Sequence, residues 1–388
     1  MIVQGRKLER VVPIANGGSI NLIATPFVYR NPLEIPPRDW IYGHHLIRRN
    51  VAVTVAPGGV GKSSLTIVQA LELASGRRLL GQWNAGPAKV WLFNLEDERS
   101  ELDRRIAAAM MHHNISEHEI EGRLFVDTGR EQELILAEQM RDEVQINTVL
   151  IDRLKSQLLD NKIDVLIVDP FVSSHRVNEM DNGKIDHVTK EWIRLAEYCG
   201  CAIELVHHTR KLNGVEATSD ASRGASSLIN AARSARVLQG LSDEELKEAA
   251  VFGDGSTYFS VKRDKANLAK AGTRETYRTV SIDLGQGDQV GVVELWKKPM
   301  PFDGVTRVNL LDIQRKIDAG EYRYSDQAEN WVGYAVAEVI SLDASKAKRR
   351  IKKLIEEWLK TEALEKVSRK MTGGKSAPFV EVGVWAYE

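Results

Sequence analysis

The sequence predicts an α/β fold with a mostly parallel sheet, followed by a small C-terminal domain. Between about residues 40 and 283, apolar segments of strand length alternate with segments of helical periodicity, which is the pattern of strands joined by crossover helices. A glycine-rich turn links one apolar segment to the next helical one, and amphipathic helices with a basic hairpin come after the main domain. We therefore divide the chain into an extended arm (1–39), a main α/β domain (40–305) and a C-terminal domain (306–388).

The periodicity predicts the elements in chain order. Apolar runs bounded by turn residues predict parallel strands at 51–56, 89–95, 124–126, 165–169 and 202–206, and a later antiparallel pair at 257–262 and 277–282. Helical spacing is clearest at 100–113, 148–160 and 187–199. The arm ends in NPLEIPPRD, whose prolines break any helix. A plain linker and an arm that contacts another subunit are both consistent with it.

Composition bounds the class of protein. The 388 residues are 43% hydrophobic and 28% charged, with a formal net charge of −1, as in a globular protein of two or three domains. The sequence has no run of about eighteen apolar residues and no secretory signal at its N-terminus, so we expect a cytoplasmic protein without a membrane span. Cys199 and Cys201 are too close together to join distant parts of the fold, and we expect both to be reduced, buried residues.

The segment VAPGGVGKSSL, residues 55–65, is typical of a phosphate-binding loop between a strand and a helix. Glycines let backbone N–H groups converge on an anion, and the helix N-terminus adds its free amides and dipole. Lys62 is expected to reach the β- and γ-phosphates of ATP, and the Ser63 hydroxyl to ligate Mg²⁺. A glycine-rich turn that binds nothing is the alternative. The residues expected to bind the nucleotide are Pro57, Gly58, Gly59, Val60, Gly61, Lys62, Ser63 and Ser64.

Two carboxylates follow predicted strands. Asp169 ends the apolar run 165–169, which is typical of a strand buried on both faces, and is expected to hold Mg²⁺ beside Ser63. Glu96 comes directly after the strand at 89–95, where a general base for the attacking water belongs. The alternative is that Glu96 and the two acidic residues after it only cap the next helix.

The strand at 202–206 runs into two adjacent histidines, His207 and His208. One of them can face the phosphates while the other points away, so we expect one to sense the γ-phosphate. The loop that follows is long and polar, and its first residues, Arg210 and Lys211, are candidate contacts to DNA phosphates. An ordinary surface loop is the alternative.

The C-terminal domain has its own pattern. Apolar residues at 332–340 and 351–359 have the spacing of two amphipathic helices, the second beginning near 345, and strands at 363–369 and 379–385 flank a glycine turn. Helix, basic helix and hairpin describe a winged helix. Between residues 345 and 376 we count eleven Lys/Arg against four Glu, a balance of +7 that leaves −8 for the rest. A solvated basic face is the alternative to DNA contact. The candidate DNA contacts here are Lys346, Arg349, Arg350, Lys353 and Lys375.

The order of these motifs resembles that of the RecA-like ATPases of the RepA type, which are hexameric replicative helicases of plasmids and related mobile elements. The resemblance covers about residues 35–270, and the C-terminal extension departs from the compact helicases of this type. The matching segments are 36–40, the phosphate loop 56–64, 94–97, Asp169-Pro170, 178–182, His207-His208, 222–228 and 265–267.

The resemblance implies a RecA-like core and a role for each matching residue. It implies Lys62 and Ser63 as ligands of ATP and Mg²⁺, Asp169 as the aspartate of the Mg²⁺ shell, Glu96 as the catalytic carboxylate, and His207 or His208 as the sensor. Rings of this family also place an arginine of one subunit in the ATP site of the next. Arg233, on a predicted helix, fits that position best, and its rivals are Arg223, Arg263 and Lys265.

We therefore expect an ATP-hydrolysing DNA motor that forms a homo-oligomeric ring, a hexamer by the resemblance. It would act on single-stranded DNA, and through the winged helix on duplex DNA, during replication of a plasmid or integrated element. Two other functions fit the same motifs. One is a recombination or repair ATPase that coats or remodels DNA without unwinding it. The other is an ATP-switched regulator whose winged helix is the functional end.

Overall fold

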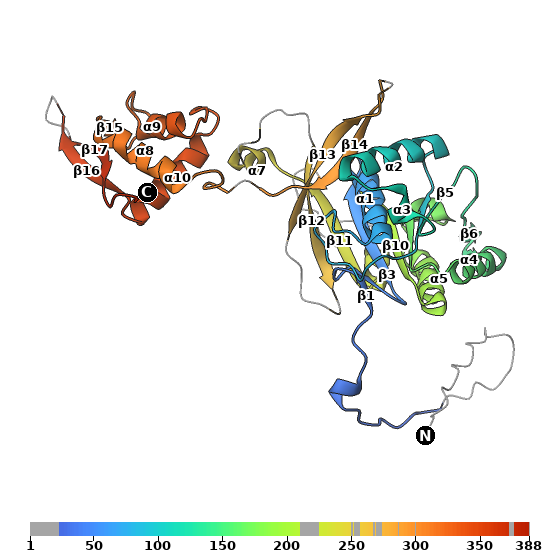
Figure 1. The fold of residues 1–388 in the computed structure, drawn as a ribbon. Helices are drawn as coiled ribbons and strands as arrows, with labels where there is room; N and C mark the ends of the chain where they lie inside the picture. The colour runs from blue at the N-terminus through green and yellow to red at the C-terminus, as the bar shows by residue number, and fades with distance from the viewer. Residues whose placement is uncertain are drawn as a thin grey trace. The chain divides into compact units, whose positions relative to one another are not determined.

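The computed structural model describes residues 23–209, 225–249, 251, 257–266, 268, 274–285, 287–298, 300–371 and 376–387. The main domain contains a nine-stranded sheet, of which six neighbouring strands run parallel in the order β11-β3-β10-β8-β4-β5 (Figure 1). The predicted α/β fold with a mostly parallel sheet is therefore confirmed. The parallel strands are β3 (Val51–Pro57), β4 (Val90–Asn94), β5 (Leu124–Thr128), β8 (Val165–Asp169), β10 (Ala202–Thr209) and β11 (Ser234–Gly240).

Three antiparallel strands extend the sheet beyond β11: β12 (Thr257–Ala266), β13 (Glu275–Asp283) and β14 (Gln289–Leu295). The predicted antiparallel pair is confirmed as β12 and β13, although both strands are longer than expected. Strands β11 and β14 were not predicted. In β11 the apolar pattern is interrupted by Arg236, which the strand buries against a partner on β10.

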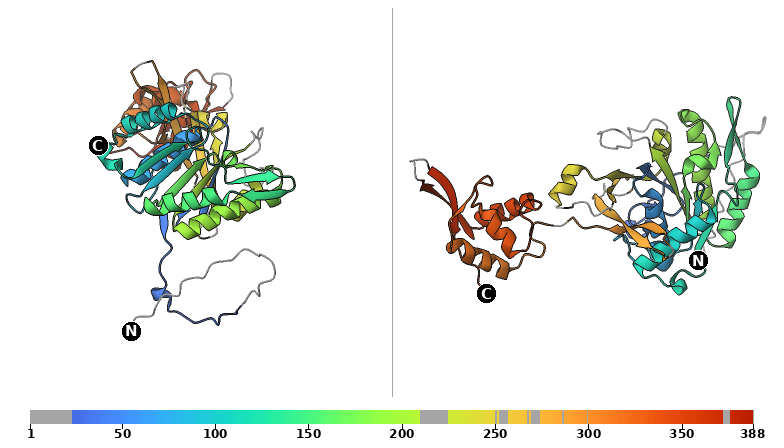
Figure 2. Two further views of the ribbon diagram at one scale, coloured as in Figure 1. Left: turned by 90° about the vertical axis from the view of Figure 1, so that its right-hand side faces the viewer. Right: turned by 90° about the horizontal axis from the view of Figure 1, so that it is seen from above.

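Helices cover both faces of the sheet (Figure 2). On one face lie α1 (Lys62–Ser75), α2 (Arg99–His113) and the short α3 (Glu117–Ile120). On the other lie α4 (Thr148–Asp160), α5 (Asn182–Cys199) and α6 (Ala225–Ala231). Helix α5 begins five residues earlier than predicted because the Asp181 side chain caps it, accepting hydrogen bonds of 3.1 Å from the amides of Gly183 and Lys184.

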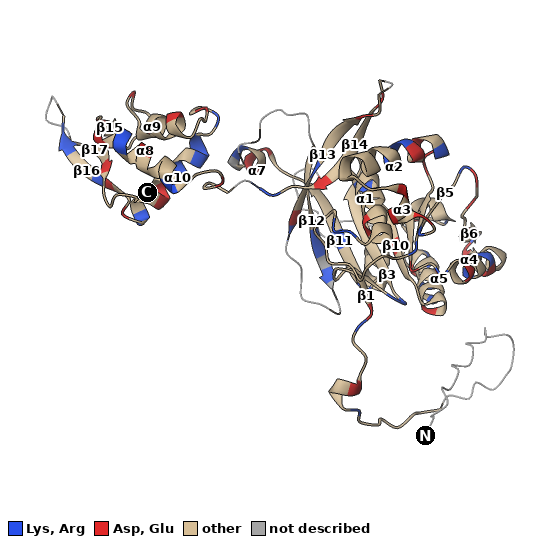
Figure 3. Cartoon of the chain, viewed as in Figure 1, with Lys and Arg blue, Asp and Glu red and all other residues tan. Residues whose placement is uncertain are grey.

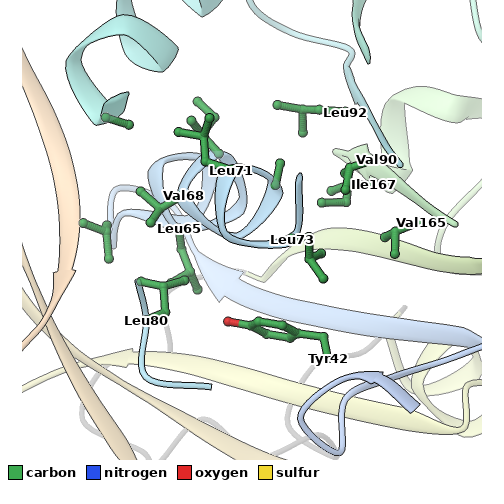
Figure 4. Close-up of a cluster of buried hydrophobic side chains, with 14 of the residues drawn as sticks. Tyr42, Leu65, Val68, Leu71, Leu73, Leu80, Val90, Leu92, Val165 and Ile167 are labelled. Carbon is green, nitrogen blue, oxygen red and sulfur yellow. The ribbon is translucent and has the colours of Figure 1, made fainter. Parts of the chain in front are cut away.

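Helix α1 is buried on nearly all sides. Its residues 65–74 are all buried, and apolar side chains of α1 pack with those of β4 and β8, as Figure 4 shows. The far edge of the sheet also reaches this helix, because Ser64 Oγ donates to the Gly291 carbonyl of β14 at 2.9 Å and accepts from the Val293 amide at 3.1 Å. A helix that is apolar all round needs such a cover, and β14 provides it.

A buried ion pair connects the middle of the sheet to α1. Arg236 Nη2 on β11 lies 2.8 Å from Glu204 Oε1 on β10, and Arg236 Nε donates to Thr54 Oγ1 on β3 at 2.7 Å. Gln69 of α1 hydrogen bonds to both charged groups. Burial by itself would raise the pKa of Glu204, but the guanidinium of Arg236 holds that pKa well below its usual range.

The C-terminal domain contains α8 (Arg307–Asp318), α9 (Val332–Val339) and α10 (Lys348–Lys360), with a three-stranded antiparallel sheet ordered β15-β17-β16. The strands are β15 (Tyr322–Arg323), β16 (Leu364–Lys370) and β17 (Ser376–Val382). Helix α8 was not predicted. Helix α10 begins at Lys348 rather than near 345 because Asp343 Oδ1 holds the preceding turn, accepting from the amides of Ser345 and Lys346.

The shorter elements complete the described part of the chain. Two small sheets pair β1 with β2, and β7, β6 and β9 in that order. No helix of the described residues has the length and apolar character needed to cross a membrane. Cys199 and Cys201 are both free thiols, whose pKa values burial raises to about 11 and about 12. The remaining elements are η1 (Pro32–Glu34), β1 (Trp40–Tyr42), β2 (Leu46–Ile47), β6 (Ala137–Met140), β7 (Glu143–Ile146), η2 (Phe171–Ser174), β9 (His175–Arg176) and α7 (Asp243–Glu248).

Candidate nucleotide site

The turn between β3 and α1 has the backbone of an anion-binding loop. Gly59 and Gly61 have φ of 81° and 99°, a region that favours glycine, and no side chain caps α1 at Gly61. A Cβ at Gly61 would also lie only 3.2 Å from the Phe259 ring and 3.3 Å from Thr279 Oγ1. Glycine is therefore required at position 61 for both conformation and space, and the first amides of α1 remain available to an anion.

Lys62 lies at the centre of the site. Its Nζ is 2.6 Å from Asp169 Oδ1 at the end of β8 and 2.7 Å from His208 Nε2 near the end of β10. The lysine donates to this nitrogen, so His208 carries its proton on Nδ1. Because the parallel strands share one carboxyl edge, residues far apart in the sequence converge here.

Glu96 lies on the other side of His208. Glu96 Oε2 is 3.7 Å from His208 Nε2, and half of the Glu96 side chain is exposed. The turn that carries Glu96 is held by Asn94, whose Oδ1 accepts from the amides of Glu96 at 2.9 Å and Asp97 at 2.7 Å. Glu96 is thus a solvent-accessible carboxylate on an ordered turn, which is what a base for an attacking water requires.

Some residues that sequence reasoning missed support this edge. Arg105 on α2 donates to Asp97 Oδ2 at 2.9 Å and to Glu101 Oε1 at 2.7 Å, which ties the turn after β4 to the helix. Thr66 Oγ1 lies 3.5 Å from Asp169 Oδ2, one helical turn after Ser63. The buried amide of Asn94 was also missed; a polar residue ending an apolar strand was the only available signal.

A cavity of about 510 Å³ opens beside the loop. The phosphate loop and His208 form one part of it, and α2 with β13 and β14 forms another. Arg104, Arg105 and Lys62 bring positive charge to its lining, as a polyanion would require. The residues that line it are Pro57, Gly59, Gly61, Lys62, Ser63, Ser64, Glu101, Arg104, Arg105, His208, Thr279, Asp288, Gln289, Val290 and Gly291.

The site fits ATP with Mg²⁺. Mg²⁺ is commonly bound through one or two carboxylates together with substrate phosphates and water. The Asp169 carboxylate and the Ser63 hydroxyl, which lies on the cavity, are oxygen donors of this kind. No group of three or more metal-ligating side chains occurs within the ranges that the structure describes, so the phosphates would have to complete the coordination.

The two histidines lie on opposite faces of β10. His208 faces α1 and Lys62, whereas His207 faces the layer of α5, where its ring lies 6.3 Å from that of Phe171. His207 Nδ1 is 3.7 Å from Glu179 Oε1. Burial, helped by the nearby charges, lowers the pKa of His207 to about 4, so its imidazole is neutral at pH 7 and the contact is not an ion pair.

The expectation for Arg233 needs correction. Helix α6 ends at Ala231, so Arg233 does not lie on a helix; it lies at the start of β11, where its amide donates to the Val51 carbonyl. This is the amino edge of the parallel strands, opposite the phosphate loop of the same subunit. Of its rivals, Lys265 donates to the carbonyls of Ile229 and Asn230 at the end of α6. Arg210, Lys211, Arg223 and Lys375 lie outside the described residues.

The basic residues of α10 divide into two groups, and Figure 3 shows Lys and Arg along this helix. Lys346, Arg349 and Lys353 are exposed. Arg350, by contrast, donates to the Pro301 carbonyl at 2.9 Å and to the Asp303 carbonyl. The Arg350 side chain therefore joins α10 to the segment before α8, and its expected role as a DNA contact competes with this structural one.

Comparison with known families agrees with this geometry. A family model described as an AAA domain matches residues 21–214, which is half of the chain and includes β3, β4, β8 and β10 with the edge they share. The chain belongs to this AAA-domain family. The AAA domain identifies the protein as a P-loop ATPase of the type found in RecA-like helicase and replication proteins, and implies the use of a nucleotide with Mg²⁺. The match ends before β11, so it does not include β11–β14 or the C-terminal domain.

Proposed function

We propose that this AAA-domain protein is an ATP-dependent DNA motor with a RecA-like core, a ring-forming replicative helicase of a plasmid or related mobile element. The observation that supports it best is the convergence of Lys62, Asp169, His208 and Glu96 beside one phosphate loop. A phosphate binder, a metal ligand, a contact to the γ-phosphate and a base are the parts that phosphoryl transfer to water needs.

Each residue would have a distinct role in hydrolysis. Lys62 leaves Asp169 and His208 for the β- and γ-phosphates, and thereby neutralises charge that develops on the transferred group. Asp169 and Ser63 would hold Mg²⁺, which bridges the phosphates when bound. Glu96 accepts a proton from the attacking water, and His208 contacts the γ-phosphate side of the site and responds to its loss.

The C-terminal domain supports DNA as the partner. Its order of helix, short strand, two helices and hairpin, with the hairpin strands beside β15, is consistent with a winged helix. Lys346, Arg349 and Lys353 form an exposed basic set at α10, suited to phosphate contacts. We infer that this domain binds duplex DNA while the ring acts on a single strand.

ATPase and unwinding assays test the proposal. Wild-type protein should hydrolyse ATP faster with single-stranded DNA present and should unwind a tailed duplex. The Lys62→Ala variant should lose at least about 10²-fold of the ATPase rate because it loses charge stabilisation in the transition state. An Arg77→Ala variant, changed at the end of α1 away from the cavity, is the control. Full activity of the Lys62→Ala variant would exclude the mechanism.

Mass measurement with and without ATP and DNA distinguishes the motor from its rivals. A closed hexamer supports the motor. A dimer whose ATPase responds weakly to DNA favours an ATP-switched regulator. Strong stimulation by DNA without unwinding of a tailed duplex favours a recombination or repair ATPase.

A further inference from the structure

Strand β10 reaches two separate regions through adjacent side chains. His208 contacts Lys62 and Glu96 on the phosphate side of the sheet. His207, one residue earlier, points to the other face, where its Nδ1 lies 3.7 Å from Glu179 Oε1. A change in the backbone at the end of β10 that moves one histidine must also move the other, because the two share one peptide unit.

Glu179 belongs to the segment 177–181, which connects β9 to α5. The segment is an ordered turn, in which Asn178 Oδ1 accepts from the Met180 amide at 3.0 Å and the Asn178 carbonyl accepts from the Asp181 amide at 3.1 Å. The side chain of Asp181 then caps α5. Met180 at the tip of the turn is 63% exposed, so the segment presents a surface to a partner.

The contact between Glu179 and His207 is incomplete. His207 Nδ1 and Glu179 Oε1 are both buried atoms without a hydrogen-bond partner among the described residues. Buried polar atoms are normally paired, and here each is the nearby candidate for the other. Shortening the 3.7 Å separation by about 0.5–1 Å would bring the two atoms into hydrogen-bond range.

We propose that Glu179 is a positioning residue that couples the nucleotide site to the segment 177–181. Binding of ATP draws Lys62 away from His208, the end of β10 adjusts, and His207 and Glu179 form the hydrogen bond that is absent in the nucleotide-free structure. The segment and the start of α5 then become more rigid. This inference rests on the proposed contact of Lys62 and His208 with the phosphates.

Burial makes a neutral hydrogen bond the form that this contact takes. The pKa of His207 is lowered to about 4 by burial first and then by the neighbouring charges, and burial raises the pKa of Glu179. The bond therefore needs a group that can donate to His207 Nδ1 or accept from it, and does not need a negative charge. Glutamine at position 179 meets this requirement, whereas alanine does not.

Hydrogen exchange of the full-length protein tests the coupling. Exchange of the amides of residues 177–185 is measured with and without a non-hydrolysable ATP analogue and Mg²⁺, in the wild type and in the Glu179→Ala, Glu179→Gln and Glu197→Ala variants. Glu197 is an exposed glutamate further along α5 and serves as the matched control. In the wild type, Glu179→Gln and Glu197→Ala, the nucleotide should slow exchange about fivefold, the effect of one added hydrogen bond.

In Glu179→Ala the slowing should disappear while the affinity for the analogue stays within about twofold of wild type. The same slowing in Glu179→Ala, or none in the wild type, overturns the coupling. Loss of nucleotide binding in Glu179→Ala also overturns it, because Glu179 would then support the site itself. A wild type that binds the analogue normally but is not stimulated by DNA contradicts the motor function alone, since the exchange measurement needs no DNA.

Discussion

The ammonium group of Lys62 lies 2.6 Å from Asp169 Oδ1, so the cation of the phosphate loop is paired with the carboxylate that ends β8. The exposed fractions of these side chains are only 5% and 2%. A buried charge that loses its partner is strongly destabilising, so each group holds the other in place before a nucleotide arrives. ATP with Mg²⁺ offers a new counter-charge to both groups, and this is why the nucleotide can open the pair.

Glu96→Gln should separate binding from hydrolysis. The amide keeps the size of the side chain but cannot accept a proton from water, so kcat should fall by about 10²- to 10³-fold. The Kd for ATP should change less than about threefold, because the side chain is half exposed and contacts the phosphate side only through His208. Glu98→Gln, two residues further on, is the control and should keep its kcat. Equal losses in both variants would remove Glu96 from the reaction.

Gly61→Ala should damage the phosphate loop. A Cβ at this residue meets a φ of 99° and the Phe259 ring at 3.2 Å, so the strain should cost ~1–2 kcal/mol and lower the affinity for ATP at least about tenfold. Gly58→Ala is the matched control, because a Cβ there has no atom within 4 Å and the backbone is not left-handed. Titration with a fluorescent ATP analogue measures both. An unchanged affinity for Gly61→Ala would contradict the assigned geometry.

Arg236→Met should destabilise the main domain. It leaves the Glu204 carboxylate buried without its counter-charge, at a cost of about 3–5 kcal/mol in the free energy of unfolding. The double variant Glu204→Leu/Arg236→Met should recover part of this loss, since it removes both charges. Urea unfolding followed by tryptophan fluorescence measures these changes, with the exposed Arg233→Met as control. A double variant less stable than Arg236→Met would show that the charges are not coupled.

Glu72 should make stability depend on pH. Burial raises its pKa to about 8, so the folded protein binds this proton more tightly than the unfolded chain does. The associated stability is present below the unfolded pKa of about 4.5 and is lost as the pH rises toward 8. Between pH 6 and 8, the free energy of unfolding of the wild type should fall by ~1–3 kcal/mol relative to Glu72→Gln. Glu197→Gln should follow the wild type, and parallel curves for wild type and Glu72→Gln would refute the shift.

Arg349→Ala and Arg350→Ala should differ although the residues are adjacent on α10. Arg349 is exposed, so its loss should weaken DNA binding uniformly across sequences and reduce the slope of log K against log salt by about 1. Arg350 holds the carbonyls of Pro301 and Asp303, so its loss should lower the melting temperature of the C-terminal domain. Binding of a labelled duplex at several salt concentrations, with thermal unfolding of both variants, checks this. Equal DNA affinity for wild type and Arg349→Ala would remove α10 from the interface.

Sequence reasoning predicted the local parts of this protein well. The phosphate loop is a strand, a glycine turn and a helix start within about fifteen residues, so its signal is complete in one short segment. Asp169 was recognisable because a strand buried on both faces is a continuous apolar run, and a carboxylate that ends it is conspicuous. The amphipathic helices α9 and α10 followed from periodicity alone.

The sequence by itself determined the α/β class, the phosphate loop and the acids at the strand ends, because these depend on short-range periodicity and backbone freedom. Only the tertiary structure decided that His208 rather than His207 faces Lys62, since a period of two places adjacent residues on opposite faces without saying which face α1 covers. Packing likewise decided that β11 buries Arg236, because its partner Glu204 is 32 residues earlier in the chain. The Lys62–Asp169 pair spans 107 residues, and no local pattern reports a contact over that distance.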